Sequence, residues 1–482
     1  MRKLLTISAA LLLSACTSSQ LHSDALSKIE TPSKIDVSSK FEDIKHNDIA
    51  LRAFLQAMPK GGDLHNHLSG AVYAESWIAW AEEDGLCLDK AALRVHFPTK
   101  DGCGENTTVK AALSRNQALR NQLIDNMSMR DFTAGEGWSG HDQFFRTFSV
   151  FTALPSRAGD MLAEASNRAG LQNIAYLELM VTKGLFDRIL PLVGGIALGG
   201  DAEQDYDTIM NSAFGKQLPD ILRQTKNEID LAEARKTEIL DCNTNSPQPG
   251  CKVIIRYLSQ NVRTLPSSAV LAHMIFSWHL LEQDSRFVGI NLVAPEDDYI
   301  ALRDYDEHMQ HIDYLYKTLG PRNVSLHAGE LWLGLVQPKE LRFHINDAIK
   351  VGRAKRIGHG TDIVFENNYQ DLLKHMAREN ILVEISLTSS EVILGVKGSA
   401  HPYFLYRDAG VPIAFSTDDE GVSRIDLTHE LMKAVKDLGV SYSELKQSQF
   451  DSLKYAFVDD TTKANMIKQM EKRFVEFELS YF

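Results

Sequence analysis

The sequence lacks the signatures of several common classes of protein. Its formal net charge is −13 over 482 residues, so it has no excess of positive charge with which to bind a nucleic-acid backbone. No Gly-x-Gly-x-x-Gly follows an expected strand, which argues against a dinucleotide-binding sheet. Pro-Cys-x-x-Cys is missing as well, which excludes a zinc site of the cytidine-deaminase type. There are no tandem repeats and no second long apolar segment after the N-terminus.

What is present at the N-terminus has the form of an export signal. Arg2 and Lys3 precede an apolar run, residues 4–13, which is too short to cross a bilayer as a mature helix. The run ends in Leu-Ser-Ala-Cys16, which resembles the bacterial lipobox, where cleavage before the cysteine is coupled to lipid attachment on its sulfur. Thr17 at the next position fits sorting to the outer membrane. The alternative is an ordinary secretory signal with a chance cysteine.

We therefore expect three segments along the chain. Residues 1–15 form a lipoprotein signal peptide, and residues 16–45, rich in Ser, Thr, Lys and Asp, form a flexible tether. Residues 46–482 form one large folded domain with insertions. The protein is then exported and anchored to the cell envelope through the lipid on Cys16, on the periplasmic or surface side of a membrane. The sequence leaves the oligomeric state open, a homodimer included.

The other four cysteines form two sequence-local pairs, Cys87 with Cys103 and Cys242 with Cys251. An exported chain meets an oxidising compartment, where such pairs form disulfides. We expect both pairs to be disulfides, each of which cross-links a segment inserted into the main fold. Neither pair has Cys-x-x-Cys spacing, which argues against a cysteine-ligated zinc ion.

Eight apolar, β-branched runs recur along the chain, and each is followed by turn residues and a helical pattern. Strands that alternate with helices predict parallel βαβ units, and eight units predict an α/β fold, the (β/α)8 TIM barrel, with its active site at the C-terminal ends of the strands. The alternative is an open doubly wound sheet. The runs are 64–68, 174–181, 253–258, 288–293, 324–327, 356–359, 382–387 and 413–416.

Two spacings between these runs are too long for simple βα units and predict insertions at about 84–150 and 184–250. The first contains a helical, aromatic stretch from Phe132 to Phe151, and the second contains a charged helix from Leu218 to Asp241. Insertions at the C-terminal face of a barrel usually cap the pocket or build an interface.

Four of the expected strands end in residues suited to hydrolysis on a zinc ion. Three imidazoles and one carboxylate hold such an ion and leave a position for water, while separate groups must donate and accept protons. The ligands would be His65, His67, His327 and Asp418, and the working residues would be Glu330, His359 and Asp419.

Each of these residues also has an ordinary structural interpretation. His327 would be a core histidine, Glu330 or the Asp418–Asp419 pair would cap a helix, and His359 would lie in a tight turn between glycines. Their shared position at strand ends favours a site. In contrast, His429-Glu430 begins a His-Glu-x-x-His pattern without its second histidine, so we assign it to a surface helix.

The same motifs, in the same order from about residue 58 to 430, resemble the adenosine deaminase family, including its secreted growth-factor-like branch. The motifs are Asp-Leu-His65-Asn-His67-Leu, Ser-Leu-His327-Ala-Gly-Glu330, Arg-Ile-Gly-His359-Gly-Thr, Ser-Leu-Thr-Ser-Ser390 and Ser-Thr-Asp418-Asp419. The resemblance implies one zinc ion per chain, bound by the four ligands named above. It also implies that Glu330 protonates purine N1, that His359 orients and helps to deprotonate the attacking water, and that Asp419 bonds to N7.

Three departures from the family pattern put the sugar side of the substrate in doubt. Ser69 stands where the family has an aspartate that contacts the ribose 5′-hydroxyl, Ala294 stands where it has a glycine that faces purine N3, and Ser390 replaces an asparagine. The resemblance thus places His67, Ser69, Ala294 and Asp419 around the substrate.

The expected reaction is zinc-dependent hydrolysis of adenosine or 2′-deoxyadenosine to the inosine product and ammonia. Alternatives are a related deaminase of adenine or a modified adenosine, and a non-catalytic nucleoside-binding protein. Glu330 and Asp419 suit a purine, and a binding module would need neither Glu330 nor His359.

Overall fold

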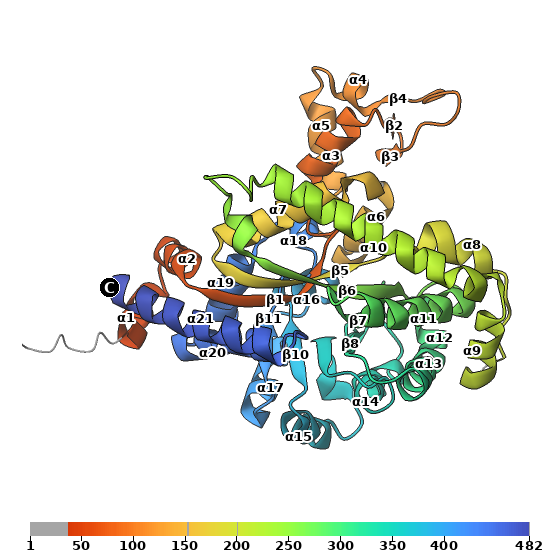
Figure 1. Ribbon diagram of the computed structural model, residues 1–482. Coiled ribbons are helices and arrows are strands. Elements are labelled where there is room, and N and C mark those ends of the chain that lie inside the picture. Colours follow the sequence, from red (N-terminus) through yellow and green to blue (C-terminus); the bar gives the residue numbers. More distant parts are fainter. Residues whose placement is uncertain (1–36, 152–153, 200, 482) are drawn as a thin grey trace, which may run out of the picture.

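The computed structural model of the chain describes residues 37–151, 154–199 and 201–481 (Figure 1). The expected signal peptide, Cys16 and most of the expected tether lie outside these residues. Within them, no helix has both the length and the apolar composition needed to span a bilayer.

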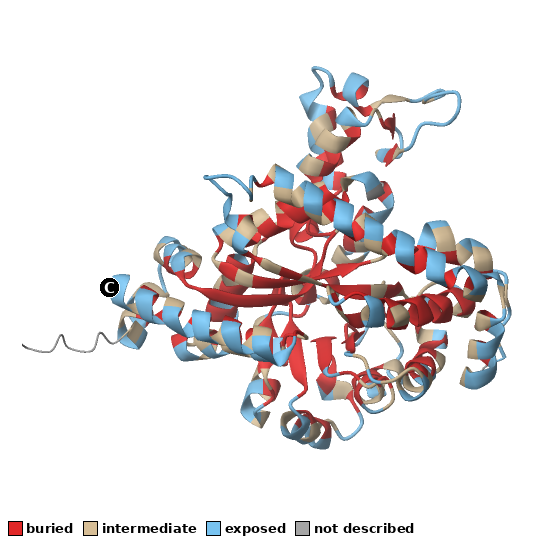
Figure 2. Cartoon of the chain, in the orientation of Figure 1, coloured by how far each residue is buried: buried red, intermediate tan, exposed pale blue. Residues whose placement is uncertain are grey.

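Eight parallel strands form the barrel predicted from the sequence. One sheet has the order β1-β5-β6-β7 and the other the order β8-β9-β10-β11. Bridges between Ile290 and Val324 and between Asn66 and Asp418 join the two sheets and close the ring. The strands are buried and lie at the centre of the molecule (Figure 2). Their bounds are β1 Lys60–His67, β5 Ile174–Val181, β6 Ile254–Val262, β7 Phe287–Val293, β8 Ser325–Ala328, β9 Arg356–His359, β10 Leu382–Ile385 and β11 Ile413–Phe415.

Helices follow the strands and cover the outside of the barrel, as the alternating pattern predicts (Figure 1). Leu387, which we expected to end a strand, instead begins a helix. The helices are α7 Ala158–Leu171, α11 Ser267–Gln283, α12 Tyr299–Arg303, α13 Tyr305–Thr318, α14 His344–Lys350, α15 Tyr369–Glu379, α16 Leu387–Leu394, α17 Tyr403–Ala409, α18 Glu420–Ser423, α19 Leu427–Leu438, α20 Tyr442–Lys454 and α21 Asp460–Ser480.

The domain begins earlier than residue 46, so the expected tether is too long at its C-terminal end. Residues Val37–Ile44 form α1, which precedes α2 (Asp48–Ala57). Phe41 of α1 is buried, with its ring centroid 5.3 Å from that of Phe54 and 5.9 Å from that of Tyr442. Burial of this one aromatic side chain anchors a segment whose polar composition suggested a linker.

The first insertion forms a small projection on the barrel (Figure 1). It contains α3 Ala74–Glu83, α4 Val109–Leu113, α5 Gln117–Asn126 and a three-stranded antiparallel sheet of β2 Cys87–Asp89, β3 Arg94–His96 and β4 Thr107–Thr108. The predicted disulfide between Cys87 and Cys103 is present.

The aromatic helix expected over Phe132–Phe151 is shorter than predicted. It is α6, Gly140–Val150, which starts where the Ser139 side chain and the Asp142 side chain form a reciprocal capping box. Before it, Gly135 and Trp138 pair in a bridged turn. Local capping chemistry thus decides the start of the helix.

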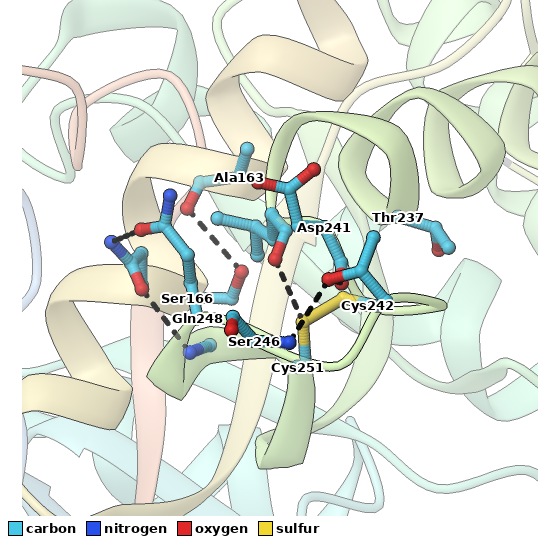
Figure 3. Close-up of a disulfide and its surroundings, with 12 residues drawn as sticks. Ala163, Ser166, Thr237, Asp241, Cys242, Ser246, Gln248 and Cys251 are labelled. Carbon is cyan, nitrogen blue, oxygen red and sulfur yellow. Dashed lines mark hydrogen bonds between the residues drawn. A yellow bond between two sulfur atoms is a disulfide. The ribbon is translucent and has the colours of Figure 1, made fainter.

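The second insertion holds α8 Leu190–Val193, α9 Ala202–Met210 and the long helix α10, Ala213–Ile239. The predicted charged helix exists but begins five residues before Leu218, because the Ser212 side chain caps its first turn and the helix continues through Pro219. The predicted Cys242–Cys251 disulfide joins the end of α10 to the turn before β6 (Figure 3).

The assignment of His429-Glu430 to a surface helix is only half correct. Both lie in α19, and His429 is exposed, but Glu430 is fully buried. Its carboxylate accepts hydrogen bonds from the backbone N–H groups of Leu387 and Thr388 at the start of α16. A buried carboxylate at a helix N-terminus satisfies donors that the helix itself leaves unpaired.

Candidate metal and active site

The four predicted metal ligands converge at the C-terminal end of the barrel. His65 and His67 end β1, His327 lies in β8, and Asp418 follows β11. The Nε2 atom of His327 is 3.0 Å from Nε2 of His65 and 3.3 Å from Nε2 of His67. The Oδ1 atom of Asp418 is 3.1 Å from Nε2 of His67 and 3.5 Å from Nε2 of His65. All four side chains are buried.

The backbone of Asp418 closes the barrel and places the carboxylate at the same time. Its N–H donates to His65 O at 2.8 Å, and its C=O accepts from the N–H of His67 at 3.1 Å. Asp418 has φ = 59°, a strained value for an aspartate, and such strain is common at functional sites.

A second layer of side chains fixes the orientation of each histidine. The Nδ1 atom of His65 is 2.7 Å from a carboxylate oxygen of Glu384, that of His67 is 2.8 Å from Oε1 of Gln260, and that of His327 is 2.6 Å from Oδ1 of Asn291. The amide groups of Gln260 and Asn291 donate elsewhere, to Thr182 Oγ1 and Ser325 O, so their oxygens face the histidines. Each Nδ1 therefore carries the proton and donates it.

It follows that three Nε2 lone pairs and one carboxylate oxygen face a common point. Neutral imidazoles protonated at Nδ1 have no proton on Nε2 to share, and a cation between the four atoms would relieve their mutual repulsion at 3.0–3.5 Å. Three nitrogen ligands and one oxygen ligand suit a divalent transition metal such as zinc. The residues present therefore fit the expected ion. Ser389 completes the layer by donating to Oδ2 of Asp418 at 2.7 Å.

The three predicted working residues lie beside this centre. Oε1 of Glu330 is 3.6 Å from Nε2 of His359, and neither ring nitrogen of His359 has a hydrogen-bond partner in the described part of the chain. Burial raises the pKa of Glu330 well above its usual value and lowers the pKa of His359 to about 3. Burial, with the neighbouring charge of Asp418, raises the pKa of Asp419 to about 7. At neutral pH, Glu330 can therefore hold a proton that it donates, whereas His359 is neutral and can accept one.

The pocket in front of the centre has a volume of about 260 Å³. All four predicted substrate contacts line it: His67, Ser69, Ala294 and Asp419. Ala294 adopts φ = 88°, a conformation that favours glycine, so the alanine at this family glycine position keeps the glycine backbone at the cost of strain. The remaining predicted departure, Ser390, is buried in α16 and bonds to Ser386 O.

Other lining residues were not identified from the sequence. Phe144, Phe145 and Phe148 project from α6, so the first insertion caps the pocket. The aromatic composition of this stretch was visible, but its position over the pocket depends on the fold. Gln260, Asn291 and Glu384 were also missed as supports of the histidines, because polar residues within strands carry no local signal of their partners.

The comparisons agree with this geometry. The family profile described as adenosine deaminase matches residues 225–473, which is more than half of the chain. Adenosine deaminase 2 of Dictyostelium discoideum is 24% identical over 446 residues, covering 88% of this chain and 74% of that protein. Adenosine deaminase of Aliivibrio fischeri is 34% identical over 157 residues, covering 31% of this chain and 42% of that protein. This chain thus matches less than half the length of the latter relative.

Solved structures share the fold. Arabidopsis ADAL complexed with IMP has a TM-score of 0.58 at 18% identity, covering 88% of this chain and 99% of that chain. A Burkholderia ambifaria amidohydrolase with bound Zn has a TM-score of 0.53 at 16% identity, covering 88% and 93%. Together with the profile match and the converging residues, these findings lead to one conclusion: the chain belongs to the adenosine deaminase family and is a hydrolytic deaminase.

Proposed function

We propose that the protein is a zinc-dependent enzyme that converts adenosine and 2′-deoxyadenosine to inosine and 2′-deoxyinosine with release of ammonia. The observation that carries the proposal is the convergence of the metal-ligand set, Glu330 and Asp419 in one pocket. Two carboxyl groups in this pocket suit two ring nitrogens of a purine, N1 and N7, which lie on either side of the 6-amino group.

Each residue has a role that its position supports. When bound by His65, His67, His327 and Asp418, zinc would supply a nucleophile at neutral pH by lowering the pKa of water to ~7. Glu330 donates a proton to N1, which makes C6 electrophilic. His359 orients the attacking water and accepts its proton. Protonated Asp419 donates a hydrogen bond to N7. The C6–N bond then breaks as the amino group takes the proton held by His359 and leaves as ammonia, while the remaining proton of the attacking water returns to Glu330.

Gly70 supports the role of Asp419. A Cβ atom on Gly70 would lie 1.5 Å from Oδ1 of Asp419, so only glycine leaves room for this carboxylate. The same oxygen has no hydrogen-bond partner in the described chain although Asp419 is buried. A buried carboxyl oxygen without a partner is costly. N7 of adenosine carries no hydrogen, so a hydrogen bond from protonated Asp419, whose pKa is raised to about 7, to N7 would satisfy this oxygen.

Other purines remain as candidates, because the structural neighbours include an adenine deaminase of Arthrobacter aurescens and an N6-methyl-AMP deaminase of Arabidopsis thaliana. The pocket favours a nucleoside over a nucleotide. Among the described residues that line it, none is a lysine or arginine that would pair with a 5′-phosphate.

An ultraviolet assay tests the proposal. We expect loss of adenosine and 2′-deoxyadenosine absorbance, with adenine and AMP turned over more slowly. Preferred turnover of adenine, of AMP or of an N6-methylated purine would replace the substrate assignment. Binding of nucleosides without turnover of any 6-aminopurine by the zinc-loaded protein would favour a binding protein.

Ser69→Asp tests the sugar side of the pocket. A carboxylate bonds to a 5′-hydroxyl more strongly than a serine does, so the variant should sharpen the preference for adenosine over 5′-deoxyadenosine by about 1–2 kcal/mol. The measurement is the ratio of kcat/KM for the two substrates in both proteins. An unchanged ratio would show that Ser69 does not face the ribose.

We further propose that the protein is exported and anchored through lipid on Cys16. The lipobox-like Leu-Ser-Ala-Cys16 supports this, and the two disulfides suit an oxidising compartment. Metabolic labelling with a clickable fatty acid should mark the wild type and not Cys16→Ser. Equal labelling of both proteins, or of neither, would contradict the anchor.

A further inference from the structure

Glu330, the proton donor of the proposed reaction, lies in an irregular segment that directly follows β8. The preceding Gly329 has φ = 75°, and a Cβ atom there would lie 2.4 Å from Oδ1 of Asp362. The C=O of Gly329 accepts a hydrogen bond from the N–H of Thr361 at 2.8 Å. No regular secondary structure holds this segment, so its position depends on individual hydrogen bonds.

The two N–H groups of the segment bind one side chain, that of Glu296 in the loop after β7. Oε1 of Glu296 accepts from Gly329 N–H at 3.1 Å, and Oε2 accepts from Glu330 N–H at 2.9 Å. The same carboxylate accepts from Nδ1 of His344 at 2.6 Å. Glu296 is 1% exposed, and its only ion-pair partner in the described chain is His344.

The position of Glu296 separates it from the substrate. It is absent from the described residues that line the pocket, so it touches the back of the Glu330 segment and not the substrate. Its Oε atoms are fixed in turn by His344, whose ring stacks on Tyr305 with a centroid distance of 3.9 Å. His344 therefore holds the carboxylate of Glu296, and this carboxylate in turn binds the backbone N–H groups of Gly329 and Glu330.

We propose that Glu296 is a positioning residue for the proton donor, which sets the place of the Glu330 carboxyl through the backbone of residues 329 and 330. This inference rests on the proposed function, in which Glu330 protonates the purine. A proton donor must sit within a few tenths of an ångström of its acceptor, and a displacement of about 1 Å can cost ~10²-fold in rate.

Glu296→Gln is the informative variant. Glutamine keeps the size of the side chain but turns one acceptor into an NH2 group, which faces a backbone N–H and pushes the segment away. We expect kcat to fall about 10–100-fold while KM changes less than about 3-fold and zinc content stays the same. Glu296→Asp, which retains both acceptors and the charge, should recover part of the lost kcat.

Asp205→Asn is a matched control. Asp205 is also buried, and its carboxylate also accepts from a backbone N–H, that of Gly199, and bonds to a histidine ring, that of His311. It ties α9 to α13 and not the Glu330 segment. Its variant should keep kcat within about 2-fold of wild type even where the midpoint of thermal unfolding falls.

A double variant separates positioning from a structural role. In the Glu330→Gln background, Glu296→Gln should add little further loss, because the group to be positioned is already gone. A fully additive loss, a change in KM alone, or equal kcat losses in the Glu296 and Asp205 variants would overturn the inference. Absence of turnover in the wild type would instead overturn the proposed function.

Discussion

Two clusters of histidine and carboxylate side chains lie in different regions of the molecule. One is the candidate metal centre of His65, His67, His327 and Asp418, and the other joins Asp205 of α9 to Glu307 and His311 of α13. In each, the donor atoms lie within 4.8 Å of one another. By residue type and spacing alone, both are metal sites.

The hydrogen bonds behind the histidines distinguish them. Every histidine of the metal centre donates through Nδ1 to a side-chain oxygen, whereas Nδ1 of His311 has no hydrogen-bond partner in the described chain. Nothing therefore prevents Nε2 of His311 from carrying the proton, and it lies 3.2 Å from Oδ2 of Asp205. We interpret this second cluster as a hydrogen bond that ties the second insertion to the barrel. The acceptors bonded to Nδ1 of the histidines, and not the atoms that face the centre of each cluster, therefore distinguish the metal centre from the hydrogen-bonded cluster.

The largest expected effect follows from removing one histidine of each cluster. His327→Ala should lose the metal and all measurable turnover, because three ligands remain and the open side faces the pocket. His311→Ala should keep one zinc per chain and normal kcat. Metal analysis of both purified proteins decides this. If wild type binds two ions per chain and His311→Ala binds one, the comparison fails.

Glu330→Gln separates the chemistry of the pocket from its metal. The variant keeps the shape of the side chain but has no proton to give, so kcat should fall ~10²–10⁴-fold with zinc retained. Steady-state kinetics beside metal analysis measure this. Near-normal kcat would remove Glu330 from the role of proton donor.

Asn291→Ala tests the outer acceptors directly. It frees Nδ1 of His327, and loss of such an outer partner typically weakens metal binding ~10–100-fold. Competition with a chelator measures the affinity. Asn261→Ala is the control, because Asn261 is equally buried in the adjacent strand but bonds only to Ser259, Asn291 and Ser277. Equal weakening in both variants would point to general loosening of the barrel.

Asp205→Ala should have the smallest effect, and on stability alone. It leaves the N–H of Gly199 and the ring of His311 without their acceptor, which should lower the free energy of unfolding by about 1–3 kcal/mol. Zinc content and kcat should not change. Denaturant unfolding measures the effect. Asp207→Ala, which removes an exposed carboxylate, is the control. A loss of bound metal in Asp205→Ala would reveal a second metal site.

Much of the fold could be predicted because its signals are local. Ile174–Val181 and Arg356–His359 have the bounds expected from sequence. The first stands out because a strand inside a parallel barrel is a mostly apolar run, unlike the helices on either side of it. The two disulfides followed from cysteines close in sequence. The α1 helix did not, because tertiary contacts, such as those of Phe41 with Phe54 and Tyr442, make it part of the domain.

The metal ligands and Glu330, His359 and Asp419 were determined by the sequence itself, because hydrolytic chemistry restricts their residue types and parallel strands place their ends on one face. Only the tertiary structure decided which residues support them. Glu384 lies 319 positions from His65, and Gln260 lies 193 positions from His67. Glu296 likewise meets Gly329 and Glu330 only after β7 and β8 pack together. A polar side chain within a strand does not reveal its partner, because that partner is fixed only when the barrel closes.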